Sequence, residues 1–193
     1  MAYGSPRSPQ DVAAYYTHMR GGRAPAPEAL AELQKRYAAI GGHSPLAEIT
    51  ELQAQALERE LTRRRGSPWP VLVAMKHSPP FLEDRAQMLR RQGVAEVVGL
   101  VLAPHYSALS VDQYRTRVES ALDGAAAPRL RFIEGWHLHP GYVAWLAAQL
   151  RDRLSSWGGP GPLVIFTAHS LPARLREMGD PYPESLAATA AST

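Results

Sequence analysis

The spacing of hydrophobic positions changes after residue 66. Before that point apolar residues recur every three or four positions, which predicts helices over 9–19, 27–40 and 46–65. Ser8 is placed to cap the first helix, and glycines that follow the second and third would end them. In the second helix one apolar face is expected, made of Leu30, Leu33, Tyr37 and Ile40.

Beyond residue 70, short apolar runs alternate with helical patterns. The runs predict strands over 71–76, 97–103, 130–134 and 163–168. The segments between them predict helices over 81–92, 111–122 and 142–157. Strands that alternate with helices are typical of βαβ units, so we expect an α/β protein with a Rossmann-like parallel sheet covered by helices on both faces.

Polar side chains follow the ends of the predicted strands. In open parallel sheets ligands bind outside the carboxyl ends of the strands. One histidine there is usually a hydrogen-bonded structural residue, but several together favour a ligand site. His169 is the strongest candidate, because a buried strand would hold it still at the edge of a cleft. Residues 1–6 are expected to be the last residues of a further strand and the turn after it, which places Tyr3 at a strand end. The side chains that follow the four other predicted strands are His77, His105, His137 and His169.

Composition narrows the class of protein. The chain has 193 residues, of which 45% are hydrophobic and 20% charged, enough for one sizeable domain. It contains no cysteine, which excludes an iron–sulfur cluster held by this chain and fits a cytoplasmic location. The net charge of +3 comes from scattered basic residues, so we expect no nucleic-acid partner. We also expect no membrane insertion, since no apolar run reaches about 18 residues, and no nucleotide, since no glycine-rich phosphate loop is present.

Eight short motifs occur in a fixed order along nearly the whole chain. They are Ala2–Pro6, Tyr15–Arg23, Arg36–Tyr37, Ile40–Leu46, Met75–Phe81, Leu102–Ser107, Thr167–Pro172 and Gly179–Pro183. Together they resemble the amino-terminal part of the ferrochelatase family, and the tyrosine of the first motif resembles the coproporphyrin III type. The resemblance implies a chelatase-like fold and a lyase of haem biosynthesis that inserts Fe²⁺ into coproporphyrin III.

The resemblance also implies roles for individual residues. His169 would be the catalytic residue and metal ligand, while Tyr3 would face the other side of the macrocycle. The other tetrapyrrole-binding positions would be Arg20, Arg36, Tyr37, Ser44 and Tyr114. Residues 1–175 would form an amino-terminal chelatase domain and 176–193 the start of a bridge to a second domain. That carboxyl-terminal half, expected outside this chain, would supply a glutamate beside the histidine.

Several alternatives stay open at this stage. The chain could be a tetrapyrrole-binding module without turnover, or a chelatase for protoporphyrin IX or a sirohydrochlorin-type ring. Lys76 and His77 are balanced between a role in the cleft and structural packing. His137 and His139 have the spacing of a metal-binding pair, but a surface turn is the favoured interpretation. Three tryptophans are expected to be packing residues rather than a platform on which a porphyrin stacks: Trp136, Trp145 and Trp157.

Overall fold

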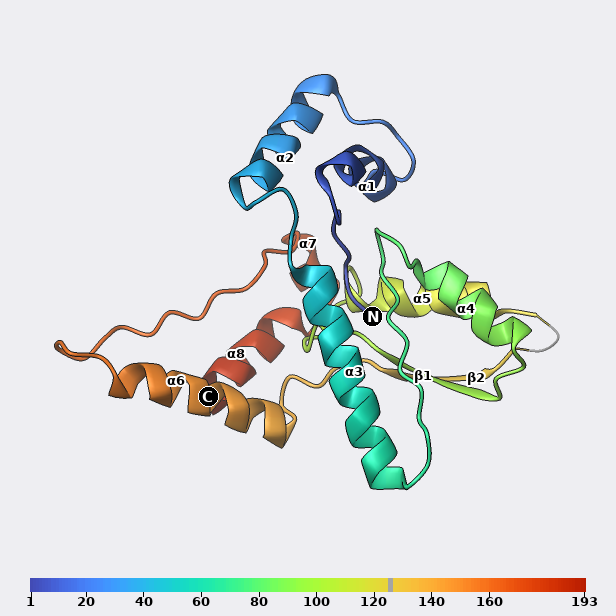
Figure 1. Cartoon of the computed structure of the whole chain (residues 1–193). Helices are drawn as coiled ribbons and strands as arrows, with labels where there is room; N and C mark the ends of the chain where they lie inside the picture. The colour runs from blue at the N-terminus through green and yellow to red at the C-terminus, as the bar shows by residue number, and fades with distance from the viewer. Residues whose placement is uncertain (125–126) are drawn as a thin grey trace. The chain divides into compact units, whose positions relative to one another are not determined.

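The structure is a computed structural model that describes residues 1–124 and 127–193 (Figure 1). The described residues form two strands, a short 3₁₀ helix and eight α-helices. The strands are β1 (Glu96–Leu100) and β2 (Arg129–Ile133). The helices are η1 (Pro9–Asp11), α1 (Val12–Met19), α2 (Pro27–Ala39), α3 (Leu46–Arg65), α4 (Leu82–Arg91), α5 (Val111–Leu122), α6 (Pro140–Ser155), α7 (Arg174–Glu177) and α8 (Tyr182–Ser192).

The chain divides into two compact units. Unit 1 comprises residues 1–96 and 117–129, and unit 2 comprises residues 97–116 and 130–193. The core of unit 1 includes Ala2, Ala47, Val73 and Met75, and the Met75 side chain is fully buried. Isolated parallel bridges join Met75 to Ala2 and to Phe81. The predicted strand over 71–76 is therefore reduced to single bridges, because too few neighbouring residues pair with it.

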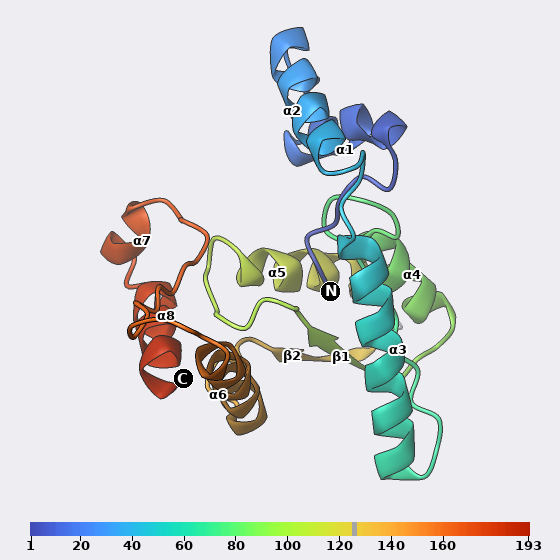
Figure 2. The same cartoon turned by 60° about the vertical axis from the view of Figure 1, so that its left-hand side comes forward.

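The helices predicted for the first part of the chain are confirmed. In unit 1, α1 and α2 pack against each other (Figure 2). The expected cap at Ser8 is wrong, because its hydroxyl donates to the Asp11 carboxylate at 2.7 Å and makes no hydrogen bond to the helix backbone. The apolar face of α2 is only partly covered, since no residue of α2 is buried and Ile40, just after it, is 61% exposed.

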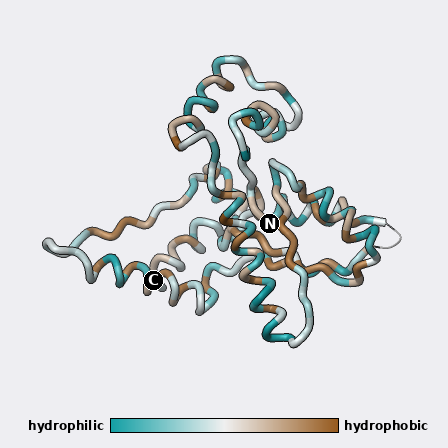
Figure 3. Tube along the Cα trace, in the orientation of Figure 1, coloured by the Kyte–Doolittle hydropathy of each residue, from teal (hydrophilic) through white to brown (hydrophobic). Residues whose placement is uncertain are grey.

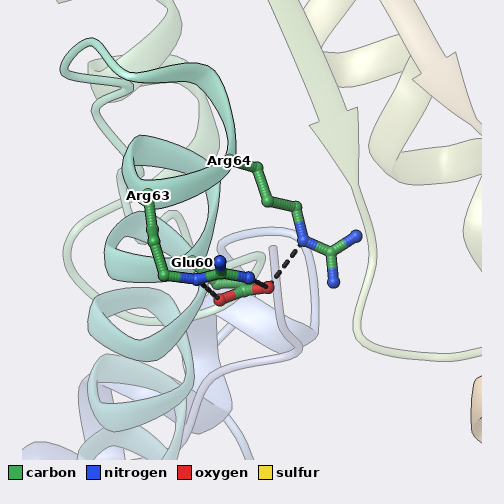
Figure 4. Close-up of polar contacts among 3 residues, drawn as sticks. All are labelled: Glu60, Arg63 and Arg64. Carbon is green, nitrogen blue, oxygen red and sulfur yellow. Dashed lines mark hydrogen bonds and ion pairs between the residues drawn. The ribbon is translucent and has the colours of Figure 1, made fainter.

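Helix α3 has the predicted bounds and ends at Gly66, whose φ of +70° is the left-handed conformation that glycine adopts easily. On its solvent face Glu60 accepts hydrogen bonds from Arg63 at 2.7 and 2.9 Å and from Arg64 at 2.6 Å (Figure 4). These bonds lower the pKa of Glu60 to about 2. The Glu60 side chain lies on the helix surface and its partners are neighbours on the same helix, so its low pKa marks helix-surface ion pairs and not a functional site.

Unit 2 contains the two-stranded parallel sheet. β1 and β2 are hydrogen-bonded neighbours and lie side by side. The ring nitrogen of Trp136, just beyond β2, donates to the carbonyl of Val101, just beyond β1, at 2.9 Å. The expectation that Trp136 packs is supported by this contact. It is wrong for Trp145 and Trp157, which are both 57% exposed.

The predicted strand over 163–168 is not formed. In the described residues its backbone makes no hydrogen bond, and it runs through the long segment between α6 and α7. Its apolar side chains face solvent: Leu163 is 85% exposed, Ile165 73% and Phe166 52%. The trace of this segment has a hydrophobic stretch, coloured brown in Figure 3. A strand needs a partner, and in the part of the chain that the structure describes the sheet consists of β1 and β2 without this segment.

The α/β class is confirmed, with helices around a parallel sheet, but the described sheet has two strands where four were predicted. Among the residues that the structure describes, no helix is both long and apolar enough to span a bilayer.

Candidate functional site

Two of the polar positions at predicted strand ends meet in unit 1. The Ala2 amide donates to the Ala74 carbonyl at 3.1 Å, and the amides of Lys76 and His77 donate to the carbonyls of Ala2 and Tyr3, both at 2.9 Å. These backbone bonds bring the rings of Tyr3 and His77 to 4.6 Å between centroids. The two side chains that the sequence singled out at residues 3 and 77 therefore form one cluster.

Gly4 is required by the turn that follows Tyr3. Its φ of +89° is a conformation that side chains disfavour, and a Cβ at this position would collide with Ser78. The Ser5 amide also donates to the Ser78 hydroxyl at 3.2 Å. The backbone after Tyr3 is thus fitted tightly against residues 75–78, which holds the tyrosine in place.

His18, near the end of α1, completes this cluster. Its Nδ1 lies 3.1 Å from Nδ1 of His77, and its ring stacks on Phe81 at 4.8 Å with an interplanar angle of 17°. Sequence reasoning did not single out His18. The signal was present, because His18 lies inside the Tyr15–Arg23 motif, but a helical histidine far from any strand end carries no pattern of its own.

Two cationic side chains, Lys76 and Arg117, lie near the cluster. Lys76 is only 7% exposed, and its Nζ lies 5.8 Å from the centre of the Tyr3 ring. Arg117 donates to the Lys76 carbonyl at 2.9 Å and to both oxygens of Glu83 at 2.6 and 2.9 Å. Burial, with Arg117 next in effect, lowers the pKa of Lys76.

The two rings nearest these cations are held neutral. Burial, together with the charges of Lys76, His18 and Arg117, lowers the pKa of His77 to about 4. Burial also raises the pKa of Tyr3, and Tyr37 raises it further. At neutral pH the cluster therefore offers a neutral imidazole and a neutral phenol, which are uncharged donors and acceptors for a ligand or metal.

The two predicted arginine anchors, Arg20 and Arg36, lie in unit 1 on the surface. The Arg20 guanidinium lies 5.8 Å from the centre of the Tyr16 ring. Arg36 forms an exposed ion pair with Glu32 at 3.1 Å on α2. Neither arginine is buried, so both are accessible to an anionic ligand, although Arg36 would have to exchange its carboxylate partner.

The remaining predicted binding positions differ in exposure. Tyr37 is partly buried and meets Tyr15 edge to face at 6.4 Å. The Ser44 hydroxyl accepts a hydrogen bond from the amide of Leu46, the first residue of α3, at 3.2 Å. Tyr114 lies in α5 and is only 4% exposed, which gives it a core position. The binding roles assigned to these three stay predictions.

His169 lies in unit 2 and is exposed. It lines a shallow pocket of about 510 Å³ together with Ser170, Arg176 and Tyr182. The Tyr182 hydroxyl donates to the His169 carbonyl at 3.0 Å. The expected buried strand does not deliver His169, because residues 163–168 are unpaired; instead Tyr182 ties its backbone to the start of α8.

Asp180 joins two segments of unit 2. It is 6% exposed and accepts hydrogen bonds from the Ser107 hydroxyl at 3.1 Å, from the Ala108 amide at 2.7 Å and from the Tyr182 amide at 3.0 Å. The Leu109 amide in turn donates to the Ser107 hydroxyl at 3.2 Å. The Gly179–Pro183 motif therefore connects the turn before α5 to the start of α8. This connection gives the motif a structural role.

A second histidine pair, of residues 105 and 137, lies in unit 2. The rings of His105 and His137 stack at 5.3 Å, and His105 Nε2 lies 2.9 Å from the Thr189 hydroxyl. Residues 137–138 form a turn, and His139 accepts a hydrogen bond from the Gly141 amide at the start of α6. In the described part of the chain no three metal-ligating side chains of the histidine, aspartate or glutamate kind come together.

The fold is that of an α/β protein with a parallel sheet, and unit 1 groups a tyrosine, two histidines and a lysine at or near the ends of extended segments as a candidate ligand site. Comparison with known proteins identifies the family: the ferrochelatase family model matches residues 1–193, and the chain belongs to this family. The resemblance read from the motifs is thereby confirmed.

Curated relatives agree with this assignment. The chain is 41% identical over 192 residues to the coproporphyrin III ferrochelatase of Halalkalibacterium halodurans, covering 98% of this chain and 62% of the relative. It is 38% identical over 190 residues to that of Bacillus subtilis, covering 96% and 61%. It is also 38% identical over 194 residues to that of Listeria monocytogenes, covering 98% and 63%. The chain thus spans about 62% of the length of these relatives.

Proposed function

We propose that this chain acts in the insertion of Fe²⁺ into coproporphyrin III, giving iron coproporphyrin III in haem biosynthesis. The observation that carries the proposal is the Tyr3–His77–His18 cluster of unit 1, found in a chain that belongs to the ferrochelatase family. The relatives named coproporphyrin III ferrochelatase support the choice of substrate. Fe²⁺ is a substrate in this reaction, and no nucleotide is required.

The chemistry needs a group that receives Fe²⁺ and groups that remove two pyrrole protons. An uncharged imidazole does both, since it ligates borderline metals and accepts a proton near neutral pH. We assign this role to His169, which is exposed beside Arg176 and Tyr182. We assign Tyr3, 43% exposed, to contact with the iron from the other side of the macrocycle.

Coproporphyrin III carries four propionates, so its site needs cations and hydrogen-bond donors. Arg20 and Arg36 are exposed and suit carboxylates, which guanidinium groups bind in a bidentate manner. The buried Lys76, whose Nζ lies 5.8 Å from the centre of the Tyr3 ring, adds a cation near Tyr3. Tyr37, Ser44 and Tyr114 belong to the proposal on family resemblance alone.

The domain organisation also stays a prediction. The expected division at residue 175 does not coincide with either compact unit, because residues 97–116 and 130–193 group together. A carboxyl-terminal half that supplies a glutamate to His169 is part of the proposal, as is a cytoplasmic location.

The proposal is tested by mixing the chain anaerobically with coproporphyrin III, with and without Fe²⁺. Porphyrin fluorescence and absorbance then separate binding from metal insertion. We expect binding, and insertion that is lost in His169→Ala. His139→Ala is the matched control, since it removes a histidine of the same unit that caps α6 and lies outside the proposed site.

Each outcome decides between the alternatives. Insertion that depends on His169 supports the proposed function. Binding without insertion supports the tetrapyrrole-binding module. A folded chain that neither binds coproporphyrin III nor inserts iron refutes the assignment, and a preference for protoporphyrin IX corrects the substrate.

A further inference from the structure

We propose that His18 is a positioning residue that holds His77 in one orientation and one tautomer, and through His77 holds the ring of Tyr3. The inference deepens the proposed function and rests on it, because Tyr3 is the residue there assigned to contact the iron. It assigns a role to a residue of helix α1 that lies outside the set of predicted binding positions.

The first step is the hydrogen bond between the two imidazoles. Nδ1 of His18 and Nδ1 of His77 are 3.1 Å apart. Two imidazoles share such a bond only when one Nδ1 carries a hydrogen and the other does not. The two tautomers are therefore coupled. In the arrangement that we assign, Nδ1 of His77 carries the hydrogen and donates to Nδ1 of His18, which leaves Nε2 of His77 without a hydrogen and free to accept a proton or ligate a metal. In the described chain no hydrogen bond is made by Nε2 of His77, which leaves this atom available to a ligand.

The second step is the support behind His18. Its ring stacks on Phe81 at 4.8 Å and meets the His77 ring edge to face at 5.3 Å. Phe81 is itself bridged to Met75, and the Leu82 amide donates to the Met75 carbonyl at 3.0 Å. The His18 ring, which projects from the last turn of α1, is thus held against Phe81 at the start of α4. It therefore has little freedom to turn away from His77.

The third step leads from His77 to Tyr3. The two rings lie 4.6 Å apart with an interplanar angle of 53°, and the His77 amide donates to the Tyr3 carbonyl at 2.9 Å. A rotation of His77 would therefore remove one wall of the space that the Tyr3 ring occupies. Partners behind a metal-contacting side chain fix its direction in this way, and their loss weakens the metal contact.

Two substitutions of His18 separate its hydrogen bond from its stacking. His18→Phe keeps a flat ring against Phe81 and removes the hydrogen bond to His77. His18→Asn places an amide near the position of Nδ1, so it retains a hydrogen-bonding group and loses the ring. Met19→Phe is the control, since it adds the same ring at an exposed position of the same helix.

The measurements are the affinities for iron coproporphyrin III and for metal-free coproporphyrin III, with the ¹⁵N shifts of His77 as a direct readout of its tautomer. We expect His18→Phe to weaken binding of the iron porphyrin about tenfold and to leave metal-free binding unchanged. We expect His77 to become a mixture of tautomers, and His18→Asn and Met19→Phe to resemble the native chain.

Equal losses for both porphyrins in His18→Phe would mean that His18 only supports the fold, and unchanged His77 shifts would exclude control of the tautomer. Either result overturns the inference. If the native chain binds neither porphyrin, the proposed function fails, whereas the ¹⁵N shifts still report on the His18–His77 pair. The two failures are therefore distinguishable.

Discussion

Replacing Asp180 tests whether the Gly179–Pro183 motif is structural. The carboxylate accepts three hydrogen bonds, from the Ser107 hydroxyl and from the amides of Ala108 and Tyr182, and it is 6% exposed. A hydrogen bond to a charged group contributes about 1.5–3 kcal/mol, and buried donors left without a partner add a penalty. In Asp180→Ala, water that enters the space of the carboxylate would replace part of these hydrogen bonds. The free energy of unfolding should therefore fall by about 3–5 kcal/mol, less than the sum of the three bonds.

Two further variants grade this effect. Asp180→Asn keeps one acceptor oxygen of the two that are used, so we expect a loss of about 1–2 kcal/mol. Asp152→Ala removes the same charge from the exposed face of α6, where the described structure gives the side chain no partner. For this control we expect a change within about 0.5 kcal/mol.

The assay is urea unfolding followed by tryptophan fluorescence, which reports mainly on unit 2 because three of the four tryptophans lie there. Far-UV circular dichroism followed in parallel shows whether both signals report one transition. A loss below about 1 kcal/mol in Asp180→Ala would refute the reasoning. It would mean that water replaces the carboxylate and that the motif is needed for something other than stability.

Three other perturbations give clear expectations. Met75→Ala should lower the free energy of unfolding, measured by calorimetry, by about 2–5 kcal/mol, because the Met75 side chain is fully buried. The control is Met178→Ala, which should change this free energy very little because Met178 is half-exposed. Since the folded protein lowers the pKa of His77 to about 4, its free energy of unfolding should be steady above pH 6.5 and fall between pH 6.5 and 4. A His77→Gln variant that keeps the full slope would contradict this. Phe166→Ser should reduce self-association in light scattering without loss of stability, because Phe166 is 52% exposed in an unpaired apolar segment; unchanged scattering would show that this segment does not drive association.

Local patterns predicted the helices well. Helices α3 and α5 have the predicted bounds, and α4 and α6 differ by one or two residues at their ends. Glycines at positions 41, 42 and 66 have the positive φ angles expected where helices end. These features depend on neighbouring residues in the chain, which a sequence displays directly. The Ser8 cap failed because a nearby carboxylate, Asp11, competed for the same hydroxyl.

Features that depend on distant partners were predicted less well. The apolar run at 163–168 has the composition of a strand, but composition does not supply the neighbour that a strand needs. For the site, the meeting of Tyr3 and His77 was foreseeable from their places at the ends of extended segments. The contact of His18 with His77 was not, because it depends on how α1 packs against residues 77–81.

The pairing of the first residues with residues 74–78 has a consequence for how the protein folds. The hydrogen bond between Ser5 and Ser78 joins positions 73 residues apart. Closing a loop of that size costs about 4 kcal/mol of chain entropy, so helices α1, α2 and α3, which need only local contacts, should form first. During synthesis at about 5–20 residues per second, Tyr3 would leave the ribosome several seconds before its partners exist. The Tyr3–His77–His18 cluster is therefore among the last parts of unit 1 to form, and until then the amino-terminal segment stays open to proteases and chaperones.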